Sequence, residues 1–423
     1  MDKKYQIILI ILLLCFAIVV VGAVGASFLS ENNSDGEDIA YVNNEGNLAI
    51  NYTHGKDFDI NKKGKVEYGV TITNTTKEKT YYSIDLEILE HNKDFTVSVL
   101  DEENKVINEV KVDDNYDGRV LNLFFITADK TVRYNIVLNL NKRTKVKGEL
   151  SVINETLSSE NFADILINNL STGTAQSRVG SETSTIDEGL ITGTDNKGTA
   201  YYFRGNVKNN YVKLGDHLFR IVRINGDGTV RLVMDGSIGN YAYNLNGIVA
   251  GQGFNSLAYF GNTTLLSSIN TWVDINLKEY SSYLVNGDFC TDMDFSYMIN
   301  GSYYSRAYER LYVDNAPMLE CSTVYTGKAG LLSVDEVVYA GAYRNSINKS
   351  YYLYNPDIQE SYLTLTGLFY NNGMKMININ SNGSIGDGIA VGEKAAVRPV
   401  INISSAAKVN GKGTKNNPYV IVA

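Results

Sequence analysis

The chain has 423 residues, and its 47 acidic side chains outnumber 38 basic ones to give a formal net charge of −9 at pH 7. This negative charge argues against a nucleic-acid partner, because contacts to phosphate need a basic surface. A chain of this length exceeds what one ordinary hydrophobic core organises, so at least two domains are expected.

Residues 1–30 predict a short cytoplasmic stub and a transmembrane anchor. Lys3 and Lys4 precede a run of apolar and small residues at 7–29, which is long enough to cross the lipid bilayer. An acidic spacer follows at 31–40, so the positive-inside rule places the N-terminus in the cytoplasm and the rest of the chain outside the cell. The alternative is a cleaved signal peptide and a secreted protein, because small residues end the apolar run.

Residues 41–155 carry the pattern of an all-β domain. Residues 65–73, 80–89, 119–127 and 131–140 alternate apolar and polar side chains, which is the period of half-buried strands. Polar turn clusters separate these runs. Seven or eight short strands of this kind predict an immunoglobulin-like β-sandwich.

Two segments of this domain resemble a known group of surface domains. Residues 46–52 read Gly-Asn-Leu-Ala-Ile-Asn-Tyr, and residues 68–75 read Tyr-Gly-Val-Thr-Ile-Thr-Asn-Thr. Together they resemble the opening of camelysin-like surface domains of low-GC Gram-positive bacteria, in which a strand ends in an Asn-Thr turn. The resemblance would fit a structural surface-layer or filament subunit.

Residues 156–185 are expected to connect two domains. Apolar residues recur at helical spacing between 158 and 170, which predicts a short helix. A Ser/Thr/Gly-rich stretch at 171–185 is typical of a flexible linker. The second domain is therefore expected at 186–423.

The first half of this second domain mixes strand and helix patterns. Residues 218–224 and 229–234 flank the turn sequence Asn-Gly-Asp-Gly, which predicts a β-hairpin. Residues 265–285 place apolar side chains three and four positions apart, which predicts an amphipathic helix.

The second half begins with a helix signal and continues as strands. Ser333 and Glu336 have the spacing of a capping box at the start of a short helix. Short strands are expected at 362–365, 374–380, 397–403 and 419–422. The domain is therefore of the α+β class.

Four segments of this domain, in order, resemble one protein family. They are Tyr-Tyr-Phe-Arg-Gly at 201–205, Phe-Arg-Ile-Val-Arg-Ile-Asn at 219–225, Gly-Leu-Leu-Ser-Val-Asp-Glu at 330–336 and Val-Arg-Pro-Val-Ile-Asn at 397–402. The family is an uncharacterised group of secreted or anchored Firmicute and Mollicute proteins that end, as here, in Gly-x-Gly-Thr and Asn-Pro-Tyr-Val. The resemblance implies a C-type-lectin-like fold, related to formylglycine-generating enzymes. Members commonly carry Tyr-Trp-Thr-Leu-Ser-Pro where residues 362–367 lack the Trp and the Pro.

Cysteine usage predicts one disulfide. Outside the apolar N-terminal run the chain contains only Cys290 and Cys321. A pair of cysteines in an exported chain is most simply a disulfide. On the loop-entropy model it would contribute roughly 3–4 kcal/mol to the stability of the second domain.

The usual signatures of catalysis are absent from the sequence. His54, His91 and His217 are too scattered for the two-histidine helix of a metalloprotease, and neither a P-loop nor a Gly-x-Ser-x-Gly elbow occurs. We therefore expect no metal, no cofactor and no enzyme.

Carboxylates leave one enzymatic alternative. Asp288, Asp292 and Asp294 surround Cys290, and a glycan hydrolase needs only two carboxyl groups across a cleft. Solvated loop acids are the other interpretation of the same residues.

Tyrosine points to recognition. The chain has 30 Tyr and one Trp, and many of the tyrosines lie in the turn-rich part of the second domain. Tyrosine provides rigid amphipathic contact area, which suits binding loops, although it also packs across strands in sheets. The resemblance to C-type-lectin-like domains implies ligand contacts on the loops before the final strands. The predicted ligand-binding residues are Tyr343, Tyr351, Tyr352, Phe369, Tyr370 and Asn372.

Together these features predict a membrane-anchored extracellular protein. Its second domain would be a recognition or adhesion module for an unknown glycan or protein. The alternatives are a cell-envelope enzyme, such as the carboxylate-dependent hydrolase, and a structural surface or filament subunit.

Overall fold

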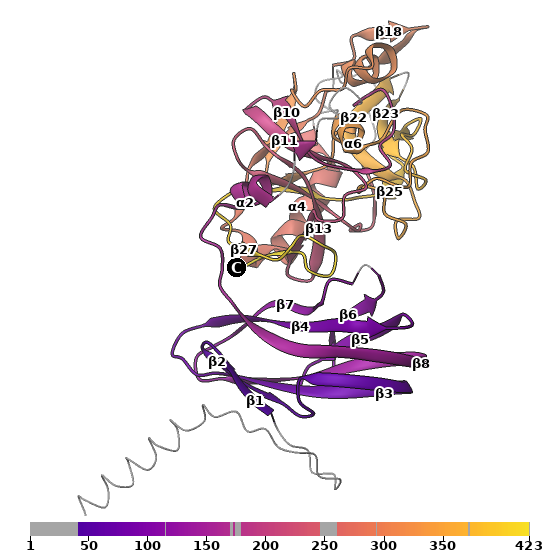
Figure 1. Cartoon of the computed structure of the whole chain (residues 1–423). Coiled ribbons are helices and arrows are strands. Elements are labelled where there is room, and N and C mark those ends of the chain that lie inside the picture. Colours follow the sequence, from indigo (N-terminus) through magenta and orange to yellow (C-terminus); the bar gives the residue numbers. More distant parts are fainter. Residues whose placement is uncertain are drawn as a thin grey trace, which may run out of the picture. The chain divides into compact units, whose positions relative to one another are not determined.

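The computed structural model describes residues 41–114, 116–169, 172–173, 179–245, 260–292, 294–370 and 373–422. It divides the chain into two compact units, Met1–Thr156 and Leu157–Ala423 (Figure 1). The predicted membrane anchor at 7–29 and the spacer at 31–40 lie outside the described residues. Among the helices that are described, none is long and apolar enough to cross a membrane.

The first unit is a β-sandwich, as the alternating pattern predicts. Its eight strands are β1 (Tyr41–Glu45), β2 (Leu48–Tyr52), β3 (Asp57–Asn74), β4 (Thr80–His91), β5 (Phe95–Leu100), β6 (Val106–Val112), β7 (Arg119–Ile126) and β8 (Thr131–Glu155). β1, β2, β3, β8, β4 and β7 are neighbours in that order, and β5 lies between β8 and β6.

Two long strands hold this sandwich together. β8 has 25 residues and pairs with β3 along most of its length, while its first half also pairs with β5 and its second half with β4. The sequence predicts only 131–140 as a strand. The strand continues because Thr144, Val146 and Leu150 keep the period of two and are buried, while the lysines between them are exposed.

The second unit also consists mostly of strands, with a few short helices. Its elements are α2 (Phe162–Asn169), β9 (Thr172–Gly173), β10 (Asp187–Asp195), β11 (Gly198–Gly205), β12 (Tyr211–Leu214), β13 (His217–Ile224), β14 (Val230–Met234), β15 (Asn240–Ala242), η2 (Phe260–Asn262), α4 (Thr264–Asn276), η3 (Lys278–Tyr280), β16 (Leu284–Val285), β17 (Gly287–Cys290), β18 (Tyr297–Ile299), β19 (Ser302–Tyr304), α5 (Arg306–Tyr308), η4 (Glu309–Asp314), β20 (Val324–Gly327), β21 (Ala329–Gly330), α6 (Val334–Ala340), β22 (Tyr362–Tyr370), β23 (Met374–Ile379), β24 (Ile389–Ala390), β25 (Lys394–Ala396), β26 (Val400–Ile403), β27 (Val409–Asn410) and β28 (Tyr419–Ile421).

Two sheets make up most of this unit. The larger contains the order β16-β26-β14-β13-β11-β10-β9, and the smaller contains β15-β25-β22-β19-β18. The hairpin predicted around 225–228 is β13–β14, which lies in the middle of the larger sheet. β18 ends the smaller sheet and lies at the periphery of the unit (Figure 1).

The helix predicted at 265–285 is shorter than expected. α4 begins after its N-cap Thr263 and ends at Asn276, and the single turn η3 follows. Residues 284–285 then pair as β16 with β26. The apolar residues of this stretch are therefore buried in different elements, and their helical spacing does not reveal where the helix ends.

The described parts of the predicted linker are folded into the second unit. The ring of Phe162 in α2 is buried and lies 5.6 Å from the ring of Tyr419, between centroids. β9 pairs with β10, and the N–H of the buried Ser184 donates to the carbonyl of Gly341 at 2.9 Å. These contacts place the start of the second unit well before residue 186.

The helix α6 begins with the capping box that the sequence predicts. Ser333 Oγ accepts from the N–H of Glu336 at 3.2 Å, and the Glu336 carboxylate accepts from the N–H of Ser333 at 2.9 Å. The same carboxylate is 2.7 Å from Arg231 Nη1 and 3.4 Å from Arg223 Nε. All three charged side chains are buried, so each depends on the others to offset its loss of hydration.

Replacing Glu336 by Gln should therefore destabilise the second unit strongly. The substitution keeps the shape of the side chain but leaves the buried Arg231 without a countercharge and Arg223 with only Asp195, 3.5 Å away. Removing one partner of a buried ion pair costs about 3–5 kcal/mol in comparable cases. Denaturant unfolding followed by a signal from the second unit measures the loss. An unfolding free energy within about 0.5 kcal/mol of the parent would contradict it.

The parent and the Glu336→Gln variant should also differ in how their stability depends on pH. Burial raises the pKa of the Glu336 carboxyl group, but the charges of Arg231 and Arg223 lower it by a larger amount. The pKa therefore lies below the ordinary value of 4.5. A lowered carboxyl pKa contributes stability above the unfolded pKa and loses it as the pH falls through the folded pKa. The advantage of the parent over Glu336→Gln should be constant at neutral pH and shrink below pH 4.5.

Candidate functional site

A short β-hairpin at the edge of the smaller sheet presents exposed aromatic surface, and its Tyr303 is the one aromatic residue among the exposed large hydrophobic side chains in the described part of the second unit. β18 and β19 pair with Tyr297 opposite Tyr304 and Met298 opposite Tyr303. The turn is Asn300-Gly301 with φ of 49° and 83°, which is the backbone of a tight hairpin turn that favours this dipeptide. Asn-Gly between aromatic runs is a hairpin signal, so sequence reasoning could have found this element and did not.

One face of the hairpin continues into a stack of tyrosine rings. The ring of Tyr308 in α5 lies 4.3 Å from the ring of Tyr304 and 6.5 Å from that of Tyr297. The ring of Tyr312 in η4 stacks on Tyr308 at 4.7 Å and an interplanar angle of 13°. Each such contact adds to the stability gained by burial, so the four rings stiffen one another.

The other face of the hairpin is open to solvent. Met298 is 62% exposed and its cross-strand neighbour Tyr303 is 41% exposed. Val313 in η4 is 49% exposed. We use the name tyrosine face for both sides of this hairpin together: the exposed pair Met298 and Tyr303 on one side, and the stacked rings of Tyr297, Tyr304, Tyr308 and Tyr312 that support it on the other.

Hydrogen-bond donors accompany the aromatic surface. Burial, and then the charge of Asp387, raise the pKa of the Tyr312 hydroxyl to about 12. A tyrosine hydroxyl is protonated at neutral pH even at its ordinary pKa, so this shift only extends to more basic solution the range over which Tyr312 is a hydrogen-bond donor. Arg344 donates to the carbonyl of Tyr312, which ties the end of the stack to the loop after α6.

A buried ion-pair cluster supports the tyrosine face from beneath. Arg310 in η4 donates to Asp292 and, at 2.8 Å, to Asp335 at the start of α6. Both carboxylates are at most 1% exposed in their side chains. On the other side, the N–H of Ser305 donates to the carbonyl of Leu368 in β22 at 3.0 Å. The segment is therefore attached both to a helix start and to the sheet.

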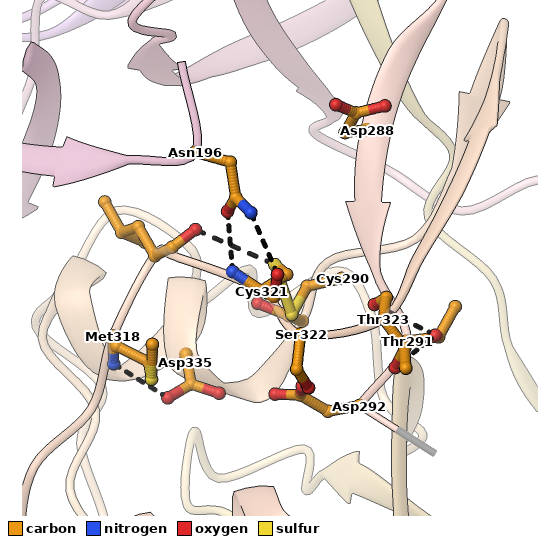
Figure 2. Close-up of a disulfide and its surroundings, with 12 residues drawn as sticks. Asn196, Asp288, Cys290, Thr291, Asp292, Met318, Cys321, Ser322, Thr323 and Asp335 are labelled. Carbon is orange, nitrogen blue, oxygen red and sulfur yellow. Dashed lines mark hydrogen bonds between the residues drawn. A yellow bond between two sulfur atoms is a disulfide. The ribbon is translucent and has the colours of Figure 1, made fainter. Parts of the chain in front are cut away.

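The predicted disulfide closes this segment at its base. Cys290 and Cys321 are joined, with their Cα atoms 5.4 Å apart (Figure 2). We call residues 291–320, which lie between them and carry the tyrosine face, the bridged segment. The side-chain amide of Asn196 accepts from the N–H of Cys321 at 2.6 Å and donates to its carbonyl at 2.9 Å (Figure 2). The bridge is thereby anchored to the turn between β10 and β11.

Two of the predicted ligand-binding residues are core residues instead. Tyr351 is 2% exposed and Tyr352 is 3% exposed. The N–H of Tyr352 donates to the carbonyl of Gly205 at 2.9 Å, and Arg398 donates to the carbonyl of Leu353 at 2.6 Å, so their loop is drawn into the interior. Turn-rich composition alone cannot distinguish an exposed loop from a loop that a buried arginine holds in the interior.

The other predicted residues lie close to the tyrosine face or outside the described residues. Tyr343 is half-buried beside Arg344, whose guanidinium is 5.9 Å from its ring centroid. The backbones of Phe369 and Tyr370 in β22 pair with Tyr304 and Tyr303, while their side chains lie outside the description. Asn372 is also outside it.

The three aspartates of the enzymatic alternative each have a different partner. The Asp292 carboxylate is occupied by Arg310, and that of Asp294 is 3.9 Å from Arg306 at the surface. The hydrogen bond from Thr326 and, against the effect of burial, the charge of Lys197 hold the pKa of Asp288 below its ordinary value, so it is no proton donor at neutral pH.

A partly open cavity lies beside the disulfide, and the volume of about 350 Å³ between its walls includes space that is continuous with the solvent. Its lining includes three carboxylates and three cations, so it favours neither an anion nor a cation; they are Asp195, Asp227, Asp288, Lys197, Arg223 and Arg231. Within the described ranges, no group of three or more His, Cys, Asp or Glu side chains could hold a metal ion.

Comparisons with known proteins add little. No protein-family model matches the chain, and no curated protein matches it. The xylanase 10B CBM22-1–GH10 modules of Clostridium thermocellum with xylohexaose match at 12% identity and a TM-score of 0.14, over 28% of this chain and 31% of that chain. Accessory secretory proteins 1, 2 and 3 of Streptococcus pneumoniae match at 10% identity and a TM-score of 0.13, over 27% of this chain and 89% of that chain. Scores this low carry no argument about fold or function.

The difference in burial between Tyr352 and Tyr303 predicts losses of stability of very different size. Tyr352→Ala removes a core ring and should lower the free energy of unfolding by about 3 kcal/mol or more. Tyr303→Ala removes a side chain that is 41% exposed and should change it by less than about 1 kcal/mol. Urea unfolding of both variants checks this, and equal losses would show that Tyr303 belongs to the core.

Proposed function

We propose that this chain is a membrane-anchored surface protein whose second unit recognises an extracellular glycan or protein. The tyrosine face is the observation that carries the proposal. Its exposed Met298 and Tyr303 lie on a stiff hairpin, and aromatic residues and methionine are enriched at recognition surfaces. The anchor at 7–29 and the extracellular location rest on the sequence pattern alone.

The support beneath the face favours tight and specific binding. Stacked rings, the Arg310 cluster and the disulfide restrict the bridged segment before any ligand arrives. A face that is already ordered loses little conformational entropy on binding, so more of the contact energy appears as affinity. Tyrosine hydroxyls at the edge provide hydrogen bonds that give direction to the contact.

The finer fold assignment is part of the proposal. The ordered motifs at 201–205, 219–225, 330–336 and 397–402 support a second unit related to C-type-lectin-like domains. The tyrosine face at 297–312 lies outside the residues 343–372 that were expected to bind the ligand, so the proposal moves the site to the hairpin that pairs with β22. For the first unit, the eight-stranded sandwich supports an immunoglobulin-like module.

The binding test combines a ligand screen with point variants. Purified protein should be screened against glycan arrays and cell-surface protein libraries, and each hit measured with Tyr303→Ala and Met298→Ala. Losing a central contact should raise Kd by about thirtyfold, which corresponds to roughly 2 kcal/mol. The matched control is Phe125→Ala, which removes an aromatic side chain of the first unit that is 54% exposed and should leave Kd unchanged.

Two results would contradict this proposal. Hits bound equally by all variants would place the binding surface elsewhere. A hit that Phe125→Ala alone weakens would move the recognition role to the first unit.

The anchor can be tested independently of the ligand. Protease treatment of intact cells should remove both folded units, because positive residues before an apolar span keep the N-terminus inside. Mass spectrometry of the remaining fragment should find the original N-terminus. A mature chain that begins after Ala26 would show signal-peptide cleavage and secretion instead.

A further inference from the structure

The disulfide is linked to the tyrosine face through a short chain of contacts. Next to Cys290, Thr291 hydrogen-bonds Thr323 at 3.1 Å, and Asp292 accepts from Ser322 Oγ at 3.3 Å (Figure 2). The same Asp292 carboxylate binds Arg310, which lies in η4 between the tyrosines of the stack. Movement of the strand at Cys290 would therefore displace the group that supports Tyr308 and Tyr312.

The two cysteine residues differ in exposure. Cys321 is partly exposed and lines the cavity of about 350 Å³, whereas Cys290 is 7% exposed and does not line it. The cavity is lined by three cations and three carboxylates, so its charges do not select one ionic form of an entering molecule. Thiol exchange proceeds through the thiolate, so access to Cys321, rather than the charge of the lining, is what favours attack at this sulfur.

We propose that the disulfide is a switch, opened by a small thiol that enters this cavity and attacks Cys321, and that opening loosens the tyrosine face. The thiolate sulfur forms a bond to Cys321 Sγ while the Cys290–Cys321 bond breaks. The bonding electron pair leaves on Cys290 Sγ, which takes up a proton from water. One thiol is consumed, and the products are a mixed disulfide on Cys321 and a free thiol at Cys290.

Opening should loosen the face without unfolding the unit. The β17–β20 ladder still pairs Gly287–Cys290 with Val324–Gly327, and β19 still pairs with β22 at two positions. What is lost is the covalent link at the base of the bridged segment, so that hydrogen bonds such as those of Thr291 and Asp292 to Thr323 and Ser322 are left to hold the support of the ring stack in place. Weaker ligand binding in the opened form rests on the proposed function, whereas the loosening itself does not.

The experiment uses the native full-length protein and 2-mercaptoethanol as the probe thiol. After brief exposure, free thiols are trapped with iodoacetamide, and mass spectrometry locates each modification. The adduct should be on Cys321 and the alkylation on Cys290. Amide hydrogen exchange at residues 294–316 should rise about tenfold, while β23, β26 and the first unit keep their protection.

Variants separate the steps of the proposal. Asn196→Ala removes the amide that holds the backbone of Cys321 and should speed adduct formation several-fold, while Thr73→Ala in the first unit should not. The double variant Cys290→Ala/Cys321→Ala should show the raised exchange without any thiol. If that variant does not fold, the exchange of the thiol-treated parent decides the question.

Three outcomes would overturn the proposal. An adduct mainly on Cys290 would show that the cavity is not the entrance. A disulfide that reacts only when the whole unit unfolds would show that it is purely structural. Complete opening with unchanged exchange at 294–316 would show that the tyrosine face does not depend on it, and none of these results bears on whether the face binds a ligand.

Discussion

The second unit depends on two adjacent carboxylates in the first turn of α6. Glu336 binds Arg231 and Arg223 of the larger sheet, and Asp335 binds Arg310 of the bridged segment. Consecutive helical residues project roughly 100° apart, so one turn can face two different parts of the molecule. Both carboxylates are buried, which is tolerable because arginine charges and the positive end of the helix offset their lost hydration. The start of α6 is therefore where the core and the candidate binding face are joined.

Other buried arginines of the same unit donate hydrogen bonds to backbone carbonyls, as the partner strand does in a regular sheet. Arg204 donates to the carbonyls of Val338 and Tyr339, Arg220 to that of Val207, and Arg398 to those of Met234 and Leu353. A fold with many short strands and long loops leaves carbonyl groups without ladder partners, and burying them unpaired would be costly. The guanidinium group has five donors in a fixed plane, so one side chain can satisfy several loops. The first unit needs less of this, because its long strands β3 and β8 pair most of its backbone.

The candidate binding face combines rigidity with exposure in a way that follows from this arrangement. Its supports are buried charges, stacked rings and a disulfide, while Met298 and Tyr303 remain in solvent. Aromatic residues in the core of the unit, such as Tyr351 and Tyr352, have the same chemistry but serve packing. The two groups of tyrosines differ in how an arginine holds their segments. Arg398 holds the loop of Tyr351 and Tyr352 in the interior, whereas Arg310 lies beneath the hairpin that carries Tyr303. Recognition would then depend on the interior of the unit as much as on the exposed side chains themselves.

The sequence by itself determined the features that depend on neighbouring residues. Alternation predicted the strands of the sandwich, Asn-Gly-Asp-Gly predicted the β13–β14 turn, and the Ser333–Glu336 spacing predicted the cap of α6, because each is a local property of the chain. A lone pair of cysteines predicted the disulfide. Only the tertiary structure decided which tyrosines are exposed, where α4 ends and that Asp335 meets Arg310. Each of these depends on which distant segment is adjacent, and period and composition contain no information about that neighbour.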